Sequence, residues 1–295
     1  MAAEAIIERR SSSIRRVDTR TATLRAIYII WYRDVIRYWR DRLRLIASLS
    51  QPLLFLVVFG TGLSTALRGA AGGFGAAPGA SVNYVQFIYP GIIGMAVLFT
   101  SIFSAMSIVW DREFGFLKEV LVAPIDRSAI AIGKALGGST QAMVQGAILL
   151  ILAPFIGVKL TPLAVIELLP LIFLLAFALT SMGVALAGGM KSMQGFQAVI
   201  NFLMMPIFFL SGALFPLNNL PAWMAVLTHL DPAAYGIDPL RRVILGASGM
   251  PATLIDRLGI TIGDRVLPMY TEVGLVLIFG VIMLAIAIGA LRRPD

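Results

Sequence analysis

The chain has 295 residues, of which 58% are hydrophobic and only 14% are charged. Soluble domains carry about 25% charged residues, so this composition excludes an ordinary soluble protein and indicates an integral membrane protein. The net charge of +8 does not predict a nucleic-acid partner, because most basic residues lie next to apolar runs. With no cysteine and one histidine, His229, the chain has no disulfide, and we expect no metal site or cofactor of its own.

The N-terminal region, residues 1–44, is expected to be a cytoplasmic tail that ends in an interfacial helix. It holds eleven arginines and no early apolar run, so we expect no cleavable signal peptide. Residues 21–45 have the pattern of an amphipathic helix, with arginines on one side and aromatic residues on the other. Such a helix lies along the inner leaflet, as a topological anchor or as a gate beside a lateral substrate entrance. The candidate gate residues are Trp31, Arg33, Arg37, Trp39, Arg40 and Arg44.

Six apolar runs are long enough to cross a hydrocarbon core of about 30 Å, which takes roughly 20 helical residues. The predicted spans are 45–67, 84–109, 135–157, 164–189, 195–217 and 272–291. The expected fold is therefore an all-α polytopic membrane protein with a single membrane domain over residues 45–295. Glu167 and Glu272, the ionisable residues inside these windows, stand near span starts and are interpreted as interfacial.

The distribution of basic residues predicts the orientation of the spans. With the N-terminus inside, eighteen Lys and Arg fall on the cytoplasmic side and six on the outer side. We therefore expect a multi-pass protein of the cell membrane with both termini in the cytoplasm.

The last outer connection, residues 218–271, contains two apolar stretches that could each form a short helix. They read "LPAWMAVLTHL" and "AYGIDPLRRVIL", and a "DP" pair separates them. Because prolines interrupt this region, a continuous span does not fit. We interpret it as two short helices that dip into the outer leaflet, and the alternative is an ordinary folded outer loop.

The stretch "DREFGFLKEVLVAPIDR", from Asp111 to Arg127, is charged at seven of its seventeen positions and lies between two apolar spans. Its apolar residues recur at helical spacing, which predicts a short amphipathic cytoplasmic helix that ends before Pro124. A helix of this length is unstable alone in water. Its apolar edge must be covered by the membrane domain or by a partner.

Two motifs resemble the permease subunits of type 2 ABC exporters. "REFGFLKEVLVAPIDRSAIAIGK" is similar to the cytoplasmic loop of that family, and "FPLNNLPAWMAVLTHLDPAAYGIDPLRRVILG" is similar to its outer signature. The resemblance covers nearly the whole chain. Three positions depart from the family pattern, since Phe116 replaces threonine, Lys118 replaces glutamate and Asp231 replaces asparagine.

The resemblance implies that Glu113 to Val120 is a coupling helix, seated in a cleft of a separate ATP-hydrolysing subunit. It also implies a dimer of permeases, expected to be a homodimer, that works with two such subunits, which would bind the ATP and magnesium. Members of the family move hydrophobic antibiotics, lipids, glycolipids or polysaccharides, and we lean to a drug-like or lipidic amphiphile. The candidate coupling residues are Arg112, Glu113, Phe114, Gly115, Phe116, Leu117, Lys118, Glu119 and Val120.

The chain is not expected to hydrolyse ATP itself. Its nearest approach to a phosphate-binding loop, "GKALGGST" from Gly133, has the lysine in the wrong place and is interpreted as small residues in a helix.

Two further sets of residues are candidates for function. In the fifth span, polar and flexible side chains could line a transport path. Alternatively, they could only pack and form hydrogen bonds between helices. These residues are Gln197, Asn201, Met204 and Met205. In the outer region Tyr235, Asp238 and Arg242 are candidates for an outer gate, because Asp238 and Arg242 stand at the i, i+4 spacing of a helix ion pair.

Two other classes of function remain open from the residues alone. An ion- or proton-coupled carrier or a channel requires ionisable groups at membrane depth, which the predicted spans lack in their middle. A membrane enzyme requires a cluster of acids, bases or metal ligands that water can reach, and the sequence offers little of this kind.

Overall fold

The computed structural model describes residues 19–69, 84–114, 126–217, 220–256, 258–262 and 265–292. The regular secondary structure of this part is helical apart from one short hairpin, in which Thr261 pairs with Val266 and Ile262 with Arg265. In chain order the elements are α2 (Thr19–Arg40), α3 (Arg42–Gly69), α4 (Tyr84–Ser104), α5 (Met106–Glu113), α7 (Arg127–Leu152), η1 (Ala153–Ile156), α8 (Pro162–Gly188), α9 (Met193–Leu210), α10 (Ala222–Leu230), α11 (Pro232–Ala247), α12 (Ala252–Asp256), β1 (Thr261–Ile262), β2 (Arg265–Val266) and α13 (Met269–Arg292).

Five stretches of helix in this part of the chain are long and apolar enough to span a membrane. They are Tyr84–Glu113, Arg127–Ile156, Pro162–Gly188, Met193–Leu210 and Met269–Arg292. These five correspond to the second to sixth predicted spans, which confirms them as candidates by length and composition. The first predicted span corresponds to α3, which bends away from α2 by 70°, and the pair gives a sixth candidate only if it is counted as one broken span.

Three helix boundaries differ from the prediction by five residues or more, each for a local reason. The amphipathic helix ends at Arg40 instead of 45, because the chain turns at Asp41 into α3, which therefore contains Arg44. The fifth span ends at Leu210 instead of 217, since the chain turns at Gly212, whose φ of 71° favours glycine. The third span begins at 127 instead of 135, because the Asp126 side chain caps the helix there.

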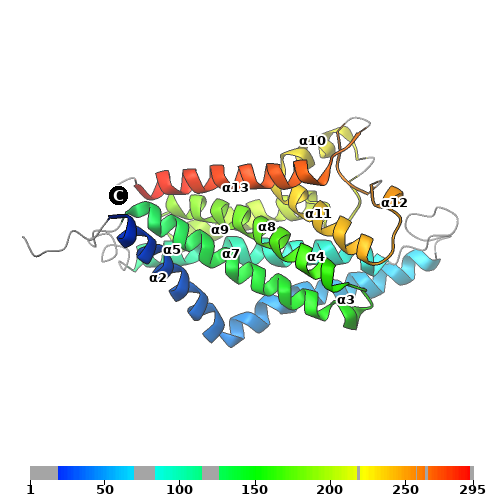
Figure 1. The fold of residues 1–295 in the computed structure, drawn as a ribbon, viewed down its shortest axis with the longest axis horizontal. Helices are drawn as coiled ribbons and strands as arrows, with labels where there is room; N and C mark the ends of the chain where they lie inside the picture. Colours follow the sequence, from blue (N-terminus) through cyan, green and yellow to red (C-terminus); the bar gives the residue numbers. More distant parts are fainter. Residues whose placement is uncertain are drawn as a thin grey trace, which may run out of the picture.

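The helices form an elongated bundle (Figure 1). Helix α8 packs against α4, α7 and α13. Helix α11 packs against α8 and also against α4 and α13. At one end of the bundle lie α5, the start of α2 and the end of α13, while α10, α11 and α12 lie toward the opposite end. We call these the inner and the outer end, after the predicted orientation.

Helices α10 and α11 are the two short helices expected in the last connection. Pro232 is the first residue of α11, and the Asp231 side chain caps that helix by accepting a hydrogen bond from the backbone N–H of Ala233 at 2.9 Å. The predicted coupling helix falls mostly outside the described residues, because α5 ends at Glu113 and the description stops after Phe114.

Candidate functional site

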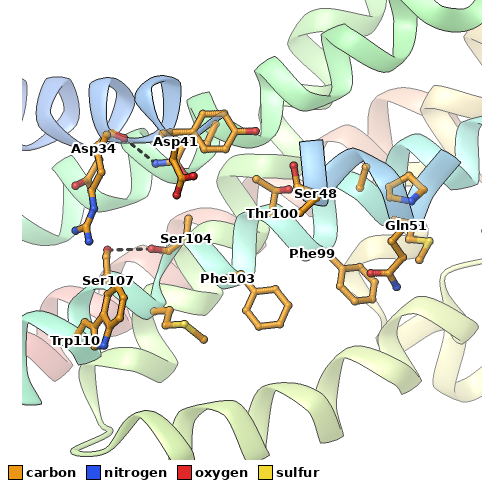
Figure 2. A pocket seen from close by; sticks show the side chains of 18 of the residues that line it. Asp34, Asp41, Ser48, Gln51, Phe99, Thr100, Phe103, Ser104, Ser107 and Trp110 are labelled. Carbon is orange, nitrogen blue, oxygen red and sulfur yellow. Dashed lines mark hydrogen bonds between the residues drawn. The ribbon is translucent and has the colours of Figure 1, made fainter. Parts of the chain in front are cut away.

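A cavity of about 670 Å³ opens at the bend between α2 and α3. Its walls also include α4, α5, α7 and α9. The side chains of Phe99 and Phe103 project from α4 into it, and Ser104, Ser107 and Trp110 continue the same wall toward the inner end (Figure 2). The cavity is therefore amphipathic along its length.

The α2 side of the cavity carries charges of both signs, and because Arg37 and Asp41 are exposed there we call it the mouth of the cavity. Asp34, Arg37 and Asp41 line it from α2 and the turn that follows. The Arg37 guanidinium lies 5.7 Å from the centre of the Trp110 ring, which is within range of a cation–π interaction. A ligand with a polar group at the mouth and an apolar body beside the phenylalanines would match this distribution.

A partly buried group of charged and polar side chains, which we call the inner cluster, lies beside the cavity and consists of Arg33, Asp34, Ser107, Asp111 and Lys134. The Lys134 Nζ atom lies 3.2 Å from Asp34 Oδ2 and 3.5 Å from Asp111 Oδ2, and it donates to Ser107 Oγ at 2.9 Å. Arg33 Nη2 lies 3.5 Å from the same Asp111 oxygen. The cluster balances two cations against two anions and joins α2, α5 and α7.

The residues that follow Asp111 hold two other helices. The Arg112 side chain donates to the backbone oxygens of Gly188 at 3.1 Å and Met190 at 2.7 Å, at the end of α8. The Glu113 carboxylate accepts a hydrogen bond at 2.9 Å from the backbone N–H of Met193, at the start of α9. These bonds match the dipoles of both helix ends.

The structure thus places two of the predicted coupling residues, Arg112 and Glu113, against helices of their own chain. Phe114 is 75% exposed and its ring meets the Trp110 ring edge to face. The other predicted coupling residues, Gly115, Phe116, Leu117, Lys118, Glu119 and Val120, lie outside the described residues.

The predicted gate residues of α2 do not share one environment. The Trp31 indole donates to Thr140 Oγ1 on α7 at 3.0 Å, whereas Trp39 is 63% exposed. Arg40 is also exposed, and it lines a shallow groove on α2 together with Arg33 and Arg37. Arg44 lies in α3 and its side chain is outside the described part of the chain.

The predicted path residues of α9 are also divided. Gln197 lines the cavity, and Met204 is buried in the bundle core. Asn201 and Met205 are exposed on α9. Only Gln197 therefore belongs to the cavity of the single chain.

Two glutamines of α7 connect the walls of the cavity. Gln141 donates to the backbone oxygen of Asp34 at 3.2 Å, and Gln145 donates to the backbone oxygen of Ser48 at 2.8 Å. Thr100 of α4 bonds to Gln145 as well. These bonds fasten α7 to α2, α3 and α4 around the cavity.

A second buried group of charges, the outer cluster, consists of Asp238, Arg241, Arg242 and Glu272. Arg242 Nη2 lies 2.8 Å from Asp238 Oδ2 and 3.1 Å from Glu272 Oε1, and it donates to the backbone oxygen of Leu267 at 2.9 Å. Arg241 bonds to the backbone oxygen of Gly212, and its guanidinium stacks 4.7 Å from the centre of the Phe87 ring. The cluster fixes α11 to α13 and to the turn after α9.

The predicted Asp238–Arg242 ion pair is therefore present, but Tyr235 is directed elsewhere. Its hydroxyl donates to the backbone oxygen of His229 at 3.0 Å, at the end of α10. Glu272, interpreted from the sequence as interfacial, is fully buried.

Sequence reasoning missed the residues that complete both clusters. The missed members are Asp34, Lys134, Arg241 and Glu272. A signal existed for Asp34 and Lys134, since an acid among the arginines of α2 and a lysine inside an apolar helix are both costly unless they are paired. In the described part of the chain, no group of three or more His, Asp or Glu side chains could hold a metal ion.

Comparisons with known proteins place most of this chain in one family. Residues 25–245 match the family described as "ABC-2 type transporter". Over 220 residues the chain is 31% identical to the "Putative transport permease ycf38" of Cyanophora paradoxa, which covers 74% of this chain and 73% of that protein. The identity is 27% over 234 residues to the "Inner membrane transport permease YadH" of Escherichia coli K12, covering 77% of this chain and 85% of that protein. It is 26% over 220 residues to "Nodulation protein J" of Rhizobium leguminosarum bv. trifolii, covering 74% and 80%. The chain belongs to the ABC-2 type transporter family.

Proposed function

We propose that this chain is the permease subunit of an ATP-driven exporter that moves a hydrophobic or amphiphilic substrate outward across the cell membrane. The substrate is a drug-like molecule, a lipid, a glycolipid or a polysaccharide, and the cavity favours the smaller amphiphiles. The chain works as a homodimer with two ATP-hydrolysing subunits, which bind the ATP and magnesium. Both termini face the cytoplasm, and α10 and α11 dip into the outer leaflet.

The observation that carries the proposal is the cavity at the bend between α2 and α3. Its volume of about 670 Å³ lies within the roughly 300 to 1,000 Å³ of sites for drug-sized ligands. Its mouth is charged and lies toward the inner end, while Phe99 and Phe103 supply an apolar wall (Figure 2). An amphiphile from the inner leaflet could enter with its polar group at Asp34, Arg37 and Asp41.

The exposed face of α9 supports a dimer. Gln197, Asn201 and Met205 stand at four-residue intervals, and all three are exposed. An amide facing lipid in a span is unfavourable, because hydrocarbon offers it no hydrogen-bond partner. A second permease copy would cover this stripe, or would enclose it in a shared path lined with water or substrate.

Transport in vesicles tests the energy source. The permease is purified from native membranes in mild detergent, any copurifying ATP-hydrolysing subunit is identified, and the complex is reconstituted with a fluorescent amphiphile. We expect accumulation of the amphiphile that requires ATP and survives an uncoupler. Accumulation that an uncoupler abolishes and that does not need ATP would instead support an ion-coupled carrier.

Substitutions in the central loop test the coupling assignment. Replacing Gly115 and Glu119 together is expected to abolish ATP-dependent export while the protein still inserts into the membrane. Unchanged export by this double variant would refute the assignment of Glu113 to Val120 as the coupling helix. The matched control is Gly274→Ala on α13, where the added Cβ meets nothing within 4 Å and export should be unchanged.

A further inference from the structure

The string "GKALGGST", from Gly133 to Thr140, places α2 directly on α7. A Cβ atom at Gly133 would lie 2.9 Å from Ile30 Cβ, and one at Gly137 would lie 3.1 Å from Asp34 Cβ. Glycines at four-residue spacing let two helices approach closely. The small residues therefore form the seat of the interfacial helix α2.

Lys134 lies between these two glycines in the sequence and reaches two helices other than its own. Its side chain is 4% exposed, and its ammonium group contacts Asp34 on α2 and both Ser107 and Asp111 on α5. A buried ammonium is stable only when opposite charges and hydrogen-bond acceptors surround it. The position of Lys134 therefore depends on both aspartates, and each aspartate is shared between Lys134 and Arg33, which lies 3.7 Å from Asp34 Oδ1 and 3.5 Å from Asp111 Oδ2.

Asp111 stands where α5 meets the central loop. The next two residues, Arg112 and Glu113, hold the end of α8 and the start of α9. In the proposed function the loop that follows receives the motion of the ATP-hydrolysing subunit. A displacement of the end of α5 then either carries Lys134 and α2 with it or breaks the contacts of Asp111 and Ser107 with the Lys134 ammonium group.

The same contacts reach the cavity. Asp34 and Ser107 both line its wall, and both touch the Lys134 ammonium group. Arg33 adds a second contact from α2 to Asp111, although its side chain is 43% exposed. Lys134 is thus the buried link between the end of α5 and the mouth of the cavity.

We infer that Lys134 is a positioning residue that transmits displacement of the α5 end to α2, so that the motion of the central loop reshapes the mouth of the cavity. The inference rests on the proposed function and adds the route by which motion reaches the substrate site. A lysine needed only for packing would affect the stability of the protein but would not determine whether α2 moves when ATP binds.

The test measures whether α2 moves when ATP is bound. Because the chain has no cysteine, Leu24→Cys on α2 and Ile278→Cys on α13 give two unique labelling sites, 66% and 57% exposed. The permease is reconstituted in lipid vesicles with a cysteine-free ATP-hydrolysing subunit, and unlabelled permease is added in excess so that distances arise within one protomer. Double electron–electron resonance is recorded without nucleotide and with ATP plus vanadate.

We expect the distance between the two labels to change with ATP plus vanadate in the unsubstituted permease. In Lys134→Met the change is lost while ATP hydrolysis by the complex continues. If Lys134→Met does not fold, the double variant Asp34→Asn with Lys134→Gln replaces it. This variant keeps a neutral hydrogen-bonding contact between the two side chains and leaves Asp111 paired with Arg33. It is also expected to lose the ATP-dependent change in distance. The matched control, Asp126→Asn, removes a carboxylate at the start of the same helix and should keep it.

Two contrary results are distinct. An unchanged response in both Lys134 variants overturns the role of Lys134 and leaves the proposed function intact. If even the unsubstituted permease shows no response to ATP, the inference is overturned, and the proposed function is overturned as well only if the same complex also fails to accumulate the fluorescent amphiphile with ATP.

Discussion

The inner and outer clusters both pair two cations with two anions, yet they connect the molecule in different ways. In the inner cluster the charged side chains range from 4% to 43% exposed, and they come from three helices beside a cavity. In the outer cluster they range from 0% to 13% exposed, and three of the four come from α11. Water that enters the cavity can compensate a displaced inner charge, whereas the outer charges are less exposed and mostly buried. The outer end is therefore built to stay fixed, and the inner end can rearrange.

The largest expected effect comes from removing the central cation of the outer cluster. In Arg242→Met the buried Asp238 and Glu272 lose the guanidinium that lies 2.8 and 3.1 Å from them. Breaking a buried ion pair in this way costs about 3 to 5 kcal/mol. Thermal unfolding in detergent should show a large fall in Tm.

The control for Arg242 is Arg292→Met. Arg292 pairs with Asp126 at 3.9 Å, and both side chains are more than half exposed. The Tm of this variant should stay near that of the unsubstituted protein, because surface ion pairs contribute little. Equal losses of stability in the two variants would contradict the distinction between a fixed outer end and a solvated inner end.

Glycine substitutions compare backbone packing at the two ends. In Gly91→Ala the new Cβ would overlap the backbone of Ala213, which cannot move aside without shifting the turn after α9. In Gly137→Ala it would lie 3.1 Å from Asp34 Cβ, where a small shift of α2 relieves the contact. Overpacking costs about 1 to 3 kcal/mol, and we expect this loss for Gly91→Ala and a smaller one for Gly137→Ala. Unfolding midpoints of the two variants, with Gly274→Ala as an unhindered control, measure the difference; a larger loss at Gly137 would reverse the ranking.

The sequence predicted the spans well because long apolar runs have few alternative structures. It also placed α10 and α11, since Pro232 and the capping Asp231 mark the start of α11. Boundaries at turns were less accurate. Gly212 and Asp41 end helices inside runs that stay apolar or amphipathic by composition, so periodicity alone did not locate them.

The candidate site was predicted only in part, because its charges lie far apart in the sequence. Asp34, Asp111 and Lys134 stand on three helices, and no local spacing relates them. The Asp238–Arg242 pair was found because both residues lie one turn apart on the same helix. Glu272, its partner from α13, again required the tertiary fold.

Two capping aspartates extend the comparison to pH. Asp126 caps α7 at the inner end, and the hydrogen bond from the Ser128 backbone N–H lowers the pKa of its carboxyl group. Asp231 makes the same kind of bond for α11, but burial raises its pKa to about 8 against the hydrogen bond from Ala233. Its second oxygen, Oδ2, has no partner among the described residues.

The raised pKa of Asp231 predicts a stability that falls with rising pH. The folded state holds this proton more tightly than the unfolded state, so the contribution is complete below about pH 4 and is lost as pH rises toward about 8. Asp231→Asn keeps the capping oxygen, carries no acid, and should be more stable than the unsubstituted protein at pH 8 by about 1 to 3 kcal/mol. Unfolding midpoints from pH 5 to pH 8 measure this, with Asp126→Asn as the exposed control. A difference between Asp231→Asn and the unsubstituted protein that does not grow with pH would contradict the prediction.

The smallest expected effect concerns an uncharged hydrogen bond between α2 and α7. Trp31→Phe keeps an aromatic ring of similar placement but removes the indole N–H that donates to Thr140 at 3.0 Å. The bond is only partly buried, so its loss should cost about 0.5 to 1.5 kcal/mol. Thr140→Val removes the acceptor instead, and a double-mutant cycle of unfolding midpoints isolates the pair. If α2 is the movable element at the inner end, the coupling energy must be small; a value as large as that of the Arg242 cluster would mean that α2 is fixed as firmly as the outer end.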